Sequence, residues 1–257
     1  MCRLLVPLVV AHVAAAVAPR ALAQNERSRP SGSETPADGL PAVFSRRPLT
    51  LPTSQWRIDL VVRLTSSRVE QPVRELGMDL ASGFGVGLFD GLELGTWLLH
   101  FQISPGFEGK PVQPYVLGRL SRGDVEPGLG LLVRLGQRPG LVLLAPVLVH
   151  LGPRVRLDTG ASAGVLPEEP TAYSMRFPVQ LAVHPAGRAF VGGGGYLELV
   201  GGNDEPADAY VGFELFAGTT AGRGPNAGTD LRVSFHVPNV VEGYKLWVLA
   251  FGIAFHP

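Results

Sequence analysis

The sequence has little charge, almost no cysteine and no long apolar run beyond its start. Only 17% of its 257 residues are charged, and its single cysteine is Cys2. Beyond about residue 24, no stretch of about 20 apolar residues runs without a charge or a Pro-Gly break, which excludes a bundle of membrane-spanning helices. An apolar content of 46% also excludes a disordered chain. These absences leave an all-β protein with an unusual amount of apolar surface.

The first residues have the organisation of an export signal. Arg3 precedes an apolar run from Leu4 to Ala18, and Ala21-Leu22-Ala23 gives the small-x-small pattern that signal peptidase cleaves. The run is too short for a helix that crosses about 30 Å of hydrocarbon. The sequence therefore predicts a signal peptide over residues 1–23, with cleavage before Gln24.

The mature chain has neither a thiol nor a basic surplus. Cys2 lies inside the predicted signal peptide and precedes its apolar run, whereas a lipoprotein carries its cysteine directly after that run. Removal of Arg3 and Arg20 leaves 20 basic against 22 acidic side chains, a formal charge of −2. Such a balance excludes a nucleic acid as partner. Residues 24–52 are rich in Ser, Pro, Arg and Glu without an apolar period, which predicts a flexible N-terminal lead-in.

From Trp56 onward, apolar residues recur at every second position. In the first segment they alternate with Arg57, Asp59 and Arg63, and a helix would scatter them around its circumference. Similar alternation recurs near residues 178, 233 and 249. The apolar members of the first segment are Trp56, Ile58, Leu60, Val62 and Leu64. This pattern predicts strands with one apolar and one polar face.

Turn residues divide the region into about 12 strands of roughly 10 to 14 residues. Soluble strands are typically five or six residues long, whereas a tilted membrane-crossing strand needs about 9 to 11. Strand length therefore favours a membrane barrel. The predicted strands are centred near residues 60, 81, 98, 116, 131, 145, 159, 178, 194, 213, 233 and 249.

The links between the predicted strands alternate in length, as they do in a barrel with short turns on one side of a membrane and long loops on the other. The second, fourth, sixth and eighth links are short, beginning with Asp90-Gly91. The first, third, seventh, ninth and eleventh are expected to be longer, the first running from Ser66 to Pro72. The fifth link, which is short, and the tenth, which is long, break the rule.

With these features the chain resembles bacterial outer-membrane β-barrel proteins. The family's last strand ends in an aromatic residue that the barrel-assembly machinery reads, and the segment from Tyr244 to Phe255 looks like that signal. It departs from the pattern because His256 and Pro257 follow Phe255. The resemblance implies an antiparallel up-and-down transmembrane β-barrel over residues 53–257, located in the bacterial outer membrane.

The alternation also assigns each side chain to a face. Five aromatic residues are expected near strand ends or in outward rows: Trp56, Trp97, Tyr173, Trp247 and Phe255. Eight cationic and five anionic residues are expected to line the lumen. In a confined lumen such charges must pair, bind water or meet a ligand, and for each residue pairing is favoured over ligand contact. An excess of three cations hints at a preference for anions. The predicted lumen-lining residues are Arg57, Asp59, Arg63, Asp79, Arg119, Arg134, Arg154, Arg156, Asp158, Arg176, Glu198, Glu214 and Arg232.

Motifs that would indicate catalysis are weak. The segment from Gly160 to Gly164 matches the G-x-S-x-G nucleophile pattern around Ser162, but the helix that this chemistry requires is replaced by a loop with two prolines. The histidines show no spacing typical of a catalytic or metal site. The sequence therefore predicts no catalytic residue, no metal site and no cofactor.

A narrow channel or transport-related outer-membrane protein with a charged, weakly cationic lumen agrees best with these observations. About 12 strands lie between the side-chain-filled barrel of 8 and the open porin of 16. The alternatives are a non-enzymatic structural or adhesion barrel, a barrel lipid hydrolase or acyltransferase, and a soluble periplasmic β-protein in which the charged face is simply solvated. Expected partners are outer-membrane lipid, the barrel-assembly machinery and a small solute. Sequence alone leaves open whether the lead-in plugs the lumen.

Overall fold

The computed structural model describes residues 41, 43–70, 73–104, 108–109, 112–136, 139–166, 172–202, 207–222, 228–241 and 246–256. The chain divides into two units, residues 1–36 and 37–257, and every described residue belongs to the second. The predicted signal peptide and residues 24–40 of the predicted lead-in lie outside the described residues. Within the described part, no helix is long and apolar enough to cross a membrane.

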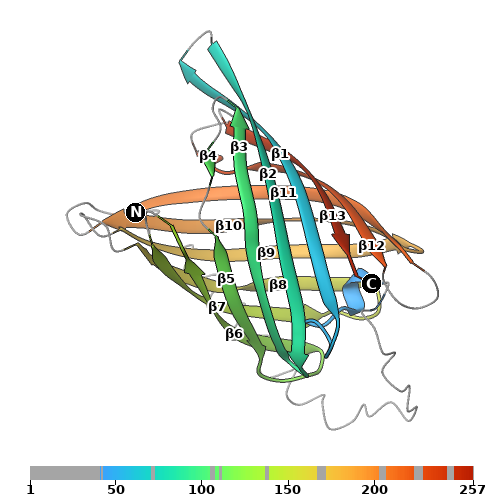
Figure 1. Ribbon diagram of the computed structural model, residues 1–257. Helices are drawn as coiled ribbons and strands as arrows, with labels where there is room; N and C mark the ends of the chain where they lie inside the picture. Colours follow the sequence, from blue (N-terminus) through green and yellow to red (C-terminus); the bar gives the residue numbers. More distant parts are fainter. Residues whose placement is uncertain are drawn as a thin grey trace, which may run out of the picture. The chain divides into compact units, whose positions relative to one another are not determined.

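Twelve long antiparallel strands form a closed barrel (Figure 1). Strand β1 pairs with β2 on one side and with the last strand, β13, on the other, and a β2–β3 pairing completes the ring. A short strand, β4 (Glu108–Gly109), pairs with β3 beside the barrel wall. The prediction of an all-β up-and-down barrel of about 12 strands is confirmed. Its long strands are β1 (Trp56–Glu70), β2 (Val73–Phe89), β3 (Leu92–Ser104), β5 (Gln113–Arg119), β6 (Val125–Arg134), β7 (Gly140–His150), β8 (Val155–Leu166), β9 (Ala172–Ala186), β10 (Ala189–Gly202), β11 (Asp208–Ala221), β12 (Thr229–Val237) and β13 (Leu246–Phe255).

Large apolar side chains lie on the outside of this barrel, the reverse of a water-soluble fold. Leu143 on β7 is 59% exposed and Leu215 on β11 is 57% exposed. The residue that follows Leu215, Phe216, points inward and is buried. Outward-facing residues therefore occur at every second position of the strand. Closure leaves each of the twelve long strands with hydrogen-bonded neighbours on both sides, which is the condition for placing strands in hydrocarbon. An apolar outer face is then matched to lipid.

The inward and outward rows follow the predicted parity except on β3. Trp97 was expected among the outward or terminal aromatics, but it lines an internal cavity and packs against Gly83 of β2. The register explains the error: Ser82 pairs with Leu99 while Gly83 pairs with Trp97, so a bulge at Leu98 inserts one residue. A bulge exchanges the faces of all residues beyond it, and sequence alternation does not reveal where it occurs.

The links differ from expectation at one place. The first link was expected to span Ser66 to Pro72, but β1 continues to Glu70 and β2 begins at Val73. By contrast, the two-residue turn Asp90-Gly91 is where it was predicted, and Gly91 has a φ of +86°, which glycine adopts without strain. We call the end of the barrel with this turn and the turns after β5, β7 and β9 the turn end.

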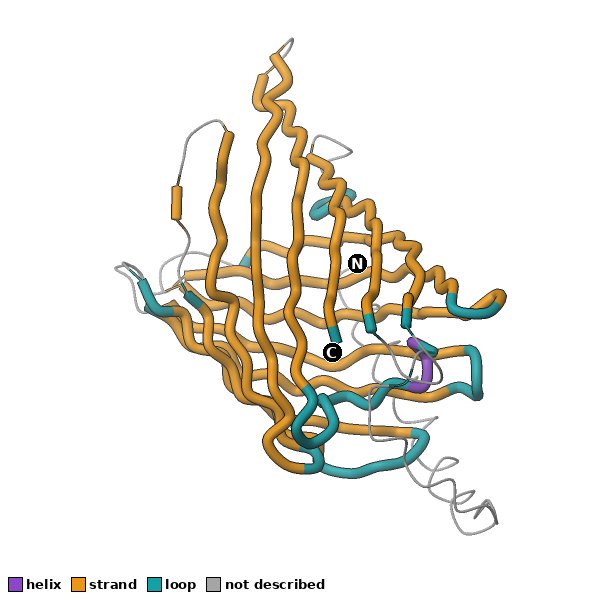
Figure 2. Tube along the Cα trace, turned by 45° about the vertical axis from the view of Figure 1, so that its right-hand side comes forward, coloured by secondary structure: helices purple, strands orange, loops and turns teal. Residues whose placement is uncertain are grey.

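A 3-10 helix, η1 (Phe44–Arg46), precedes the barrel and lies at the turn end. Figure 2 shows η1 in purple and the loop that follows it at the end of the barrel where β1 begins. Three residues of this loop, Arg47, Thr50 and Leu51, are buried against the inner wall, as described next.

Candidate functional site

Residues 43–55, which we call the inner segment, lie inside the barrel at its turn end. Four of them are buried: Ser45, Arg47, Thr50 and Leu51. The sequence predicted residues 24–52 to be a flexible lead-in, and for its described part, from residue 43 onward, that prediction is wrong. The physical reason is that the inward face of the barrel supplies specific partners for this segment, and these partners come from distant strands.

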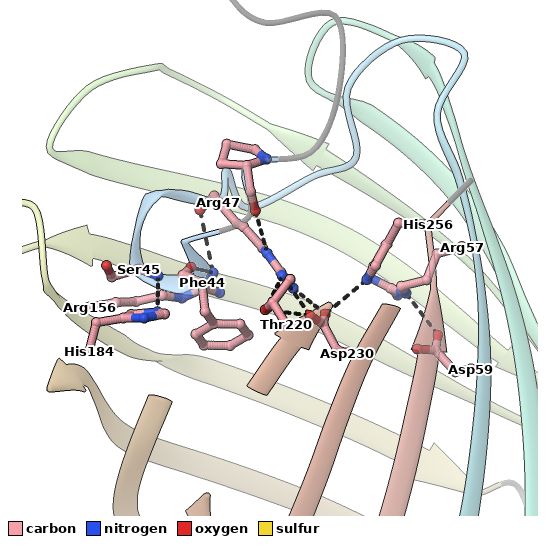
Figure 3. A network of polar contacts seen from close by, with 11 residues as sticks. Phe44, Ser45, Arg47, Arg57, Asp59, Arg156, His184, Thr220, Asp230 and His256 are labelled. Carbon is pink, nitrogen blue, oxygen red and sulfur yellow. Dashed lines mark hydrogen bonds and ion pairs between the residues drawn. The ribbon is translucent and has the colours of Figure 1, made fainter. Parts of the chain in front are cut away.

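The strongest attachment is made by Arg47 (Figure 3). Its guanidinium forms a bidentate ion pair with Asp230 at the start of β12, with Nη2 2.7 Å from Oδ1 and Nη1 bound to Oδ2. Nη2 also donates to Thr220 Oγ1 of β11 at 3.0 Å, and Nε donates to the Pro41 carbonyl at 2.9 Å. The side chains of Arg47 and Asp230 are only 6% and 11% exposed. A buried charge is tolerated only with such complete pairing.

The C-terminal end of the chain takes part in this cluster. His256 follows β13 and is buried, and its Nε2 lies 2.9 Å from Asp230 Oδ2. The residue that interrupts the terminal aromatic pattern of the sequence is therefore a partner of the carboxylate that holds Arg47. We call Arg47, Thr220, Asp230 and His256 the Arg47 anchor.

Two buried glutamates hold the backbone of the inner segment. The amide of Leu49 donates to Glu126 Oε2 of β6, and the amide of Leu51 donates to Glu93 Oε2 of β3, each at 2.8 Å. Because a buried amide needs a partner and this segment belongs to no sheet, the carboxylates replace the missing strand. Glu93 is shared further, since Tyr115 donates its hydroxyl to Oε1 at 2.7 Å.

The helix η1 is fixed by contacts to β7 and β9. Ser45 donates its amide to His184 Nε2 at 3.2 Å, and its carbonyl lies 2.7 Å from His150 Nδ1. Phe44 stacks on Phe190 of β10 with 4.8 Å between ring centroids, and the guanidinium of Arg156 lies 4.8 Å from the centroid of the Phe44 ring. Figure 3 shows Arg156 and His184 on the same side of the segment as Phe44. The barrel wall therefore supplies both a packing surface for the Phe44 ring and hydrogen-bond partners for the Ser45 backbone.

The segment lies so close to the wall that one strand position must be glycine. A Cβ atom on Gly87 of β2 would overlap the carbonyls of Leu51 and Pro52. The backbone of Gly87 also exchanges hydrogen bonds with the segment: Ser54 N donates to Gly87 O at 2.8 Å, and Gly87 N donates to Gln55 O at 2.9 Å. The absent side chain is thus what allows this approach.

Two cavities border the inner segment. The first, of about 330 Å³, is lined by Arg47, Asp230 and His256 of the anchor together with Arg57, Asp59, Glu93 and Trp97. The second, of about 410 Å³, is lined by residues of β7 to β12, among them Arg176, Gln180, Tyr196 and Glu214. Both volumes lie within the range of small-molecule sites. The two cavities share a few lining residues: Phe44, Leu49, Arg156 and Arg232.

Several predicted lumen-lining residues are neighbours in the structure. Three ion pairs form, and two further pairs of opposite charge are register partners on adjacent strands. Arg119 binds Asp90 at 2.6 Å and lies 3.6 Å from Glu126. The ion pairs are Arg57–Asp59 at 2.8 Å, Arg156–Asp158 at 2.6 Å and Arg232–Glu214 at 2.6 Å, and the register partners are Arg63 with Asp79 and Arg176 with Glu198.

Two predicted lumen residues stand apart from these pairs. Arg154 lies in the exposed turn after β7 rather than in a strand, because β8 begins only at Val155. Arg134 ends β6, and its Nε is a buried atom without a hydrogen-bond partner in the described part of the chain. Arg154 therefore differs from the expectation, since its turn projects from the end of the barrel.

Sequence reasoning missed the residues that hold the inner segment. Glu93 and Glu126 are the second residues of β3 and β6. Continuing the alternation back from Arg134 would have placed Glu126 inward, whereas on β3 the bulge at Leu98 hides the inward direction of Glu93. Asp230 is two residues before Arg232 and shares its face. Nothing in the sequence indicated Arg47, because the apolar residues of its segment do not recur at regular positions. With Arg154 removed and Arg47, Glu93, Glu126 and Asp230 added, this set of described residues has eight cations and eight anions, without the expected excess of three cations.

Features of catalytic or metal chemistry find little support in the geometry. Ser162, the candidate nucleophile, lies within β8 and pairs with Leu144 of β7 and Arg176 of β9, so it is on a continuous strand and not on an elbow. Among the described residues, no group of three or more His, Cys, Asp or Glu side chains is placed to hold a metal ion.

Comparisons with known proteins agree on the fold. No family model and no curated sequence matches the chain. Among solved structures, it is similar to an outer membrane channel from Pseudomonas putida F1, with a TM-score of 0.59 and 10% identity over 81% of this chain and 97% of that one. It is also similar to the translocator domain of the autotransporter NalP from Neisseria meningitidis, with a TM-score of 0.47 and 10% identity over 79% and 88% of the two chains. The chain has the fold of outer-membrane β-barrel proteins.

Proposed function

We propose that this protein is an outer-membrane channel for small solutes, and that the inner segment narrows its lumen at the turn end. The observation that carries the proposal is a closed barrel whose outer face is apolar and whose inner face is charged and borders two cavities. A barrel of 12 strands with a segment folded into its lumen is wide enough for ions and single small solutes, but too narrow for general diffusion. The similar structure from Pseudomonas putida F1, described as a channel, supports this class of function.

The test is conductance of the refolded mature chain in planar lipid bilayers. We expect small, discrete conductance steps from the unaltered protein and larger steps from Arg47→Ala, in which the inner segment loses its main attachment. Arg122→Ala is the matched control, because Arg122 forms an exposed ion pair with Asp90 in a turn. Absence of conductance from all three proteins, each shown to be folded by its heat-modifiable mobility, would contradict the channel.

The channel is proposed to act without chemistry of its own. Phospholipid hydrolysis by the purified barrel is expected to be absent, and Ser162→Ala is expected to leave conductance unchanged. Hydrolysis that Ser162→Ala abolishes would contradict this and favour a barrel lipid hydrolase.

The proposed partners follow from the two ends and the outer face of the barrel. Outer-membrane lipid would cover the outward rows, and the barrel-assembly machinery would read β13, which carries outward Phe251 and Phe255. In this proposal His256 is not part of the signal, since it turns inward to Asp230. We expect His256→Ala to insert into outer membranes as efficiently as the unaltered chain, whereas Phe255→Asp lowers insertion.

A further inference from the structure

The second cavity contains an arginine whose charge is unmatched by the wall around it. The Arg176 guanidinium of β9 lies over the ring of Tyr196 of β10, with Cζ 3.7 Å from the ring centroid. Among the described residues, none forms an ion pair or a hydrogen bond with this guanidinium. Glu198 is its register partner on β10, yet the arginine lies over the ring and the two form no ion pair. A guanidinium stacked by its face keeps the N–H groups of its edge available.

The ring beneath Arg176 is itself held in place. The Tyr196 hydroxyl donates to the Pro238 carbonyl at 3.0 Å, and it lies 3.0 Å from His236 Nε2. Gly212 of β11 faces this ring, and a Cβ atom there would overlap it. Tyr196 is therefore a fixed platform, which orients the guanidinium before any ligand arrives and lowers the entropic cost of binding.

The other charges of this cavity are already used. Arg232 binds Glu214 Oε1 at 2.6 Å, and Gln180 donates to Glu214 Oε2 at 3.2 Å, so both carboxylate oxygens are occupied. Arg156 binds Asp158 through two nitrogens. Three arginines and two acids line the cavity, and Arg176 is the cation left over.

Part of the lining is apolar. Phe44 and Leu49 of the inner segment and Pro146 and Pro178 of the wall face the same cavity of about 410 Å³. A site of this size with one available cation, otherwise paired charges and an apolar part is built for a molecule of one negative charge and a compact apolar body. A second negative charge would meet Asp158 and Glu214 in the same space.

We infer that the second cavity binds organic monocarboxylates with an apolar body, with Arg176 receiving the carboxylate through its free edge. The inference rests on the proposed channel and names the class of solute that would occupy it. Arginine matches a carboxylate with two parallel N–H···O bonds, and these are stronger than bonds between neutral groups. Tyr196 acts as a positioning residue, because it holds Arg176 and does not itself reach the carboxylate.

The test is calorimetric binding of benzoate to the refolded protein, with benzamide as the neutral probe of the same shape and acetate as the anion without an apolar body. We expect benzoate to bind about tenfold or more tightly than either. Arg176→Gln is expected to weaken benzoate binding by about 10- to 100-fold and to leave benzamide unaffected. Arg176→Lys keeps the charge but lacks the two parallel N–H donors, so its affinity for benzoate should lie between those of Arg176→Gln and the unaltered protein. Arg122→Gln should bind benzoate as the unaltered protein does.

Equal binding of benzoate and benzamide, or benzoate binding unchanged by Arg176→Gln, would overturn the inference. Since Arg176 is an exposed position of the lumen, its variants are not expected to impair folding, and heat-modifiable mobility checks this directly. Measuring conductance on the same preparations separates the two proposals. Conductance without selective benzoate binding overturns the site and keeps the channel, and selective binding without conductance overturns the channel and keeps the site.

Discussion

The two cavities that border the inner segment differ in how their charges are satisfied. In the first, Arg47 and His256 share Asp230, and Arg57 lies between Asp59 and Glu93, so each of these side chains has an acid beside it. In the second, Arg176 lies on an aromatic ring without an acid in ion-pair contact among the described residues. Matched charges hold a segment in place, whereas an unmatched one is free to meet a solute. The same set of residue types thus serves structure on one side of the lumen and recognition on the other.

The largest effect is expected when the ion pair between Arg47 and Asp230 in the first cavity is removed. Arg47→Ala leaves Asp230 buried without its main counter-charge, and removal of one member of a buried pair costs about 3–5 kcal/mol. We expect the inner segment to leave its place and the single-channel conductance to rise several-fold, measured in planar bilayers. Conductance equal to that of the Arg122→Ala control would show that the anchor does not hold the segment.

A smaller effect is expected from crowding the close approach at β2. Gly87→Ala places a Cβ atom where the Leu51 and Pro52 carbonyls now lie, so the backbone of the inner segment must move away. We expect the resulting strain to lower the free energy of unfolding by about 1–3 kcal/mol. The conductance should rise less than in Arg47→Ala, because the anchor remains. Gly252→Ala is the control: Gly252 is a strand glycine that lines the first cavity, but a Cβ atom there would make only ordinary contacts. Equal effects of the two substitutions would argue against a specific approach at Gly87.

A still smaller effect is expected at His256. His256→Ala removes one contact to Asp230 while Arg47 and Thr220 keep theirs, which should cost about 1 kcal/mol. We expect a small fall in the urea concentration at which the barrel unfolds, with a modest rise in conductance. A loss as large as that of Arg47→Ala would mean that His256, and not Arg47, dominates the anchor.

The smallest effect on stability is expected in the second cavity. Arg176→Gln breaks no ion pair or hydrogen bond among the described residues and loses only the contact with the Tyr196 ring, so the free energy of unfolding should fall by no more than about 0.5–1 kcal/mol. Its selectivity should change instead: the reversal potential in a salt gradient is expected to shift toward cation preference. An unchanged reversal potential together with a large loss of stability would assign Arg176 to the structural side of the comparison.

The sequence predicted the wall of the barrel well and its contents poorly. The alternation from Trp56 to Leu64 assigns faces correctly, because side-chain direction in a strand depends only on parity. The predicted direction of Trp97 was wrong because a bulge at Leu98 changes that parity. The amino-acid composition of a strand does not indicate where a bulge occurs. The pairs Arg57–Asp59 and Arg156–Asp158 were accessible to the same reasoning, since residues two apart on a strand share a face.

The inner segment was beyond sequence reasoning for a physical reason. Its order comes from partners far away in the chain: Arg47 and Asp230 are separated by 183 residues, and Leu49 and Glu126 by 77. A polar stretch without a period reads as flexible unless its acceptors are known. The available cation in the second cavity was equally hidden, because the register that places Glu198 opposite Arg176 does not reveal that the arginine lies on Tyr196 instead.

The most direct test of the account uses the absence of cysteine from the predicted mature chain. Leu49→Cys and Gly128→Cys are added to the Arg47→Ala barrel, because a Cβ atom on Gly128 would touch the Leu49 side chain. Single-channel conductance is then measured before and after reduction, with bond formation followed by a free-thiol assay. If the inner segment narrows the lumen, the oxidised barrel has low conductance and reduction raises it to the level of Arg47→Ala. Equal conductance in the two states, or no bond under oxidant, would contradict the placement of the segment inside the barrel.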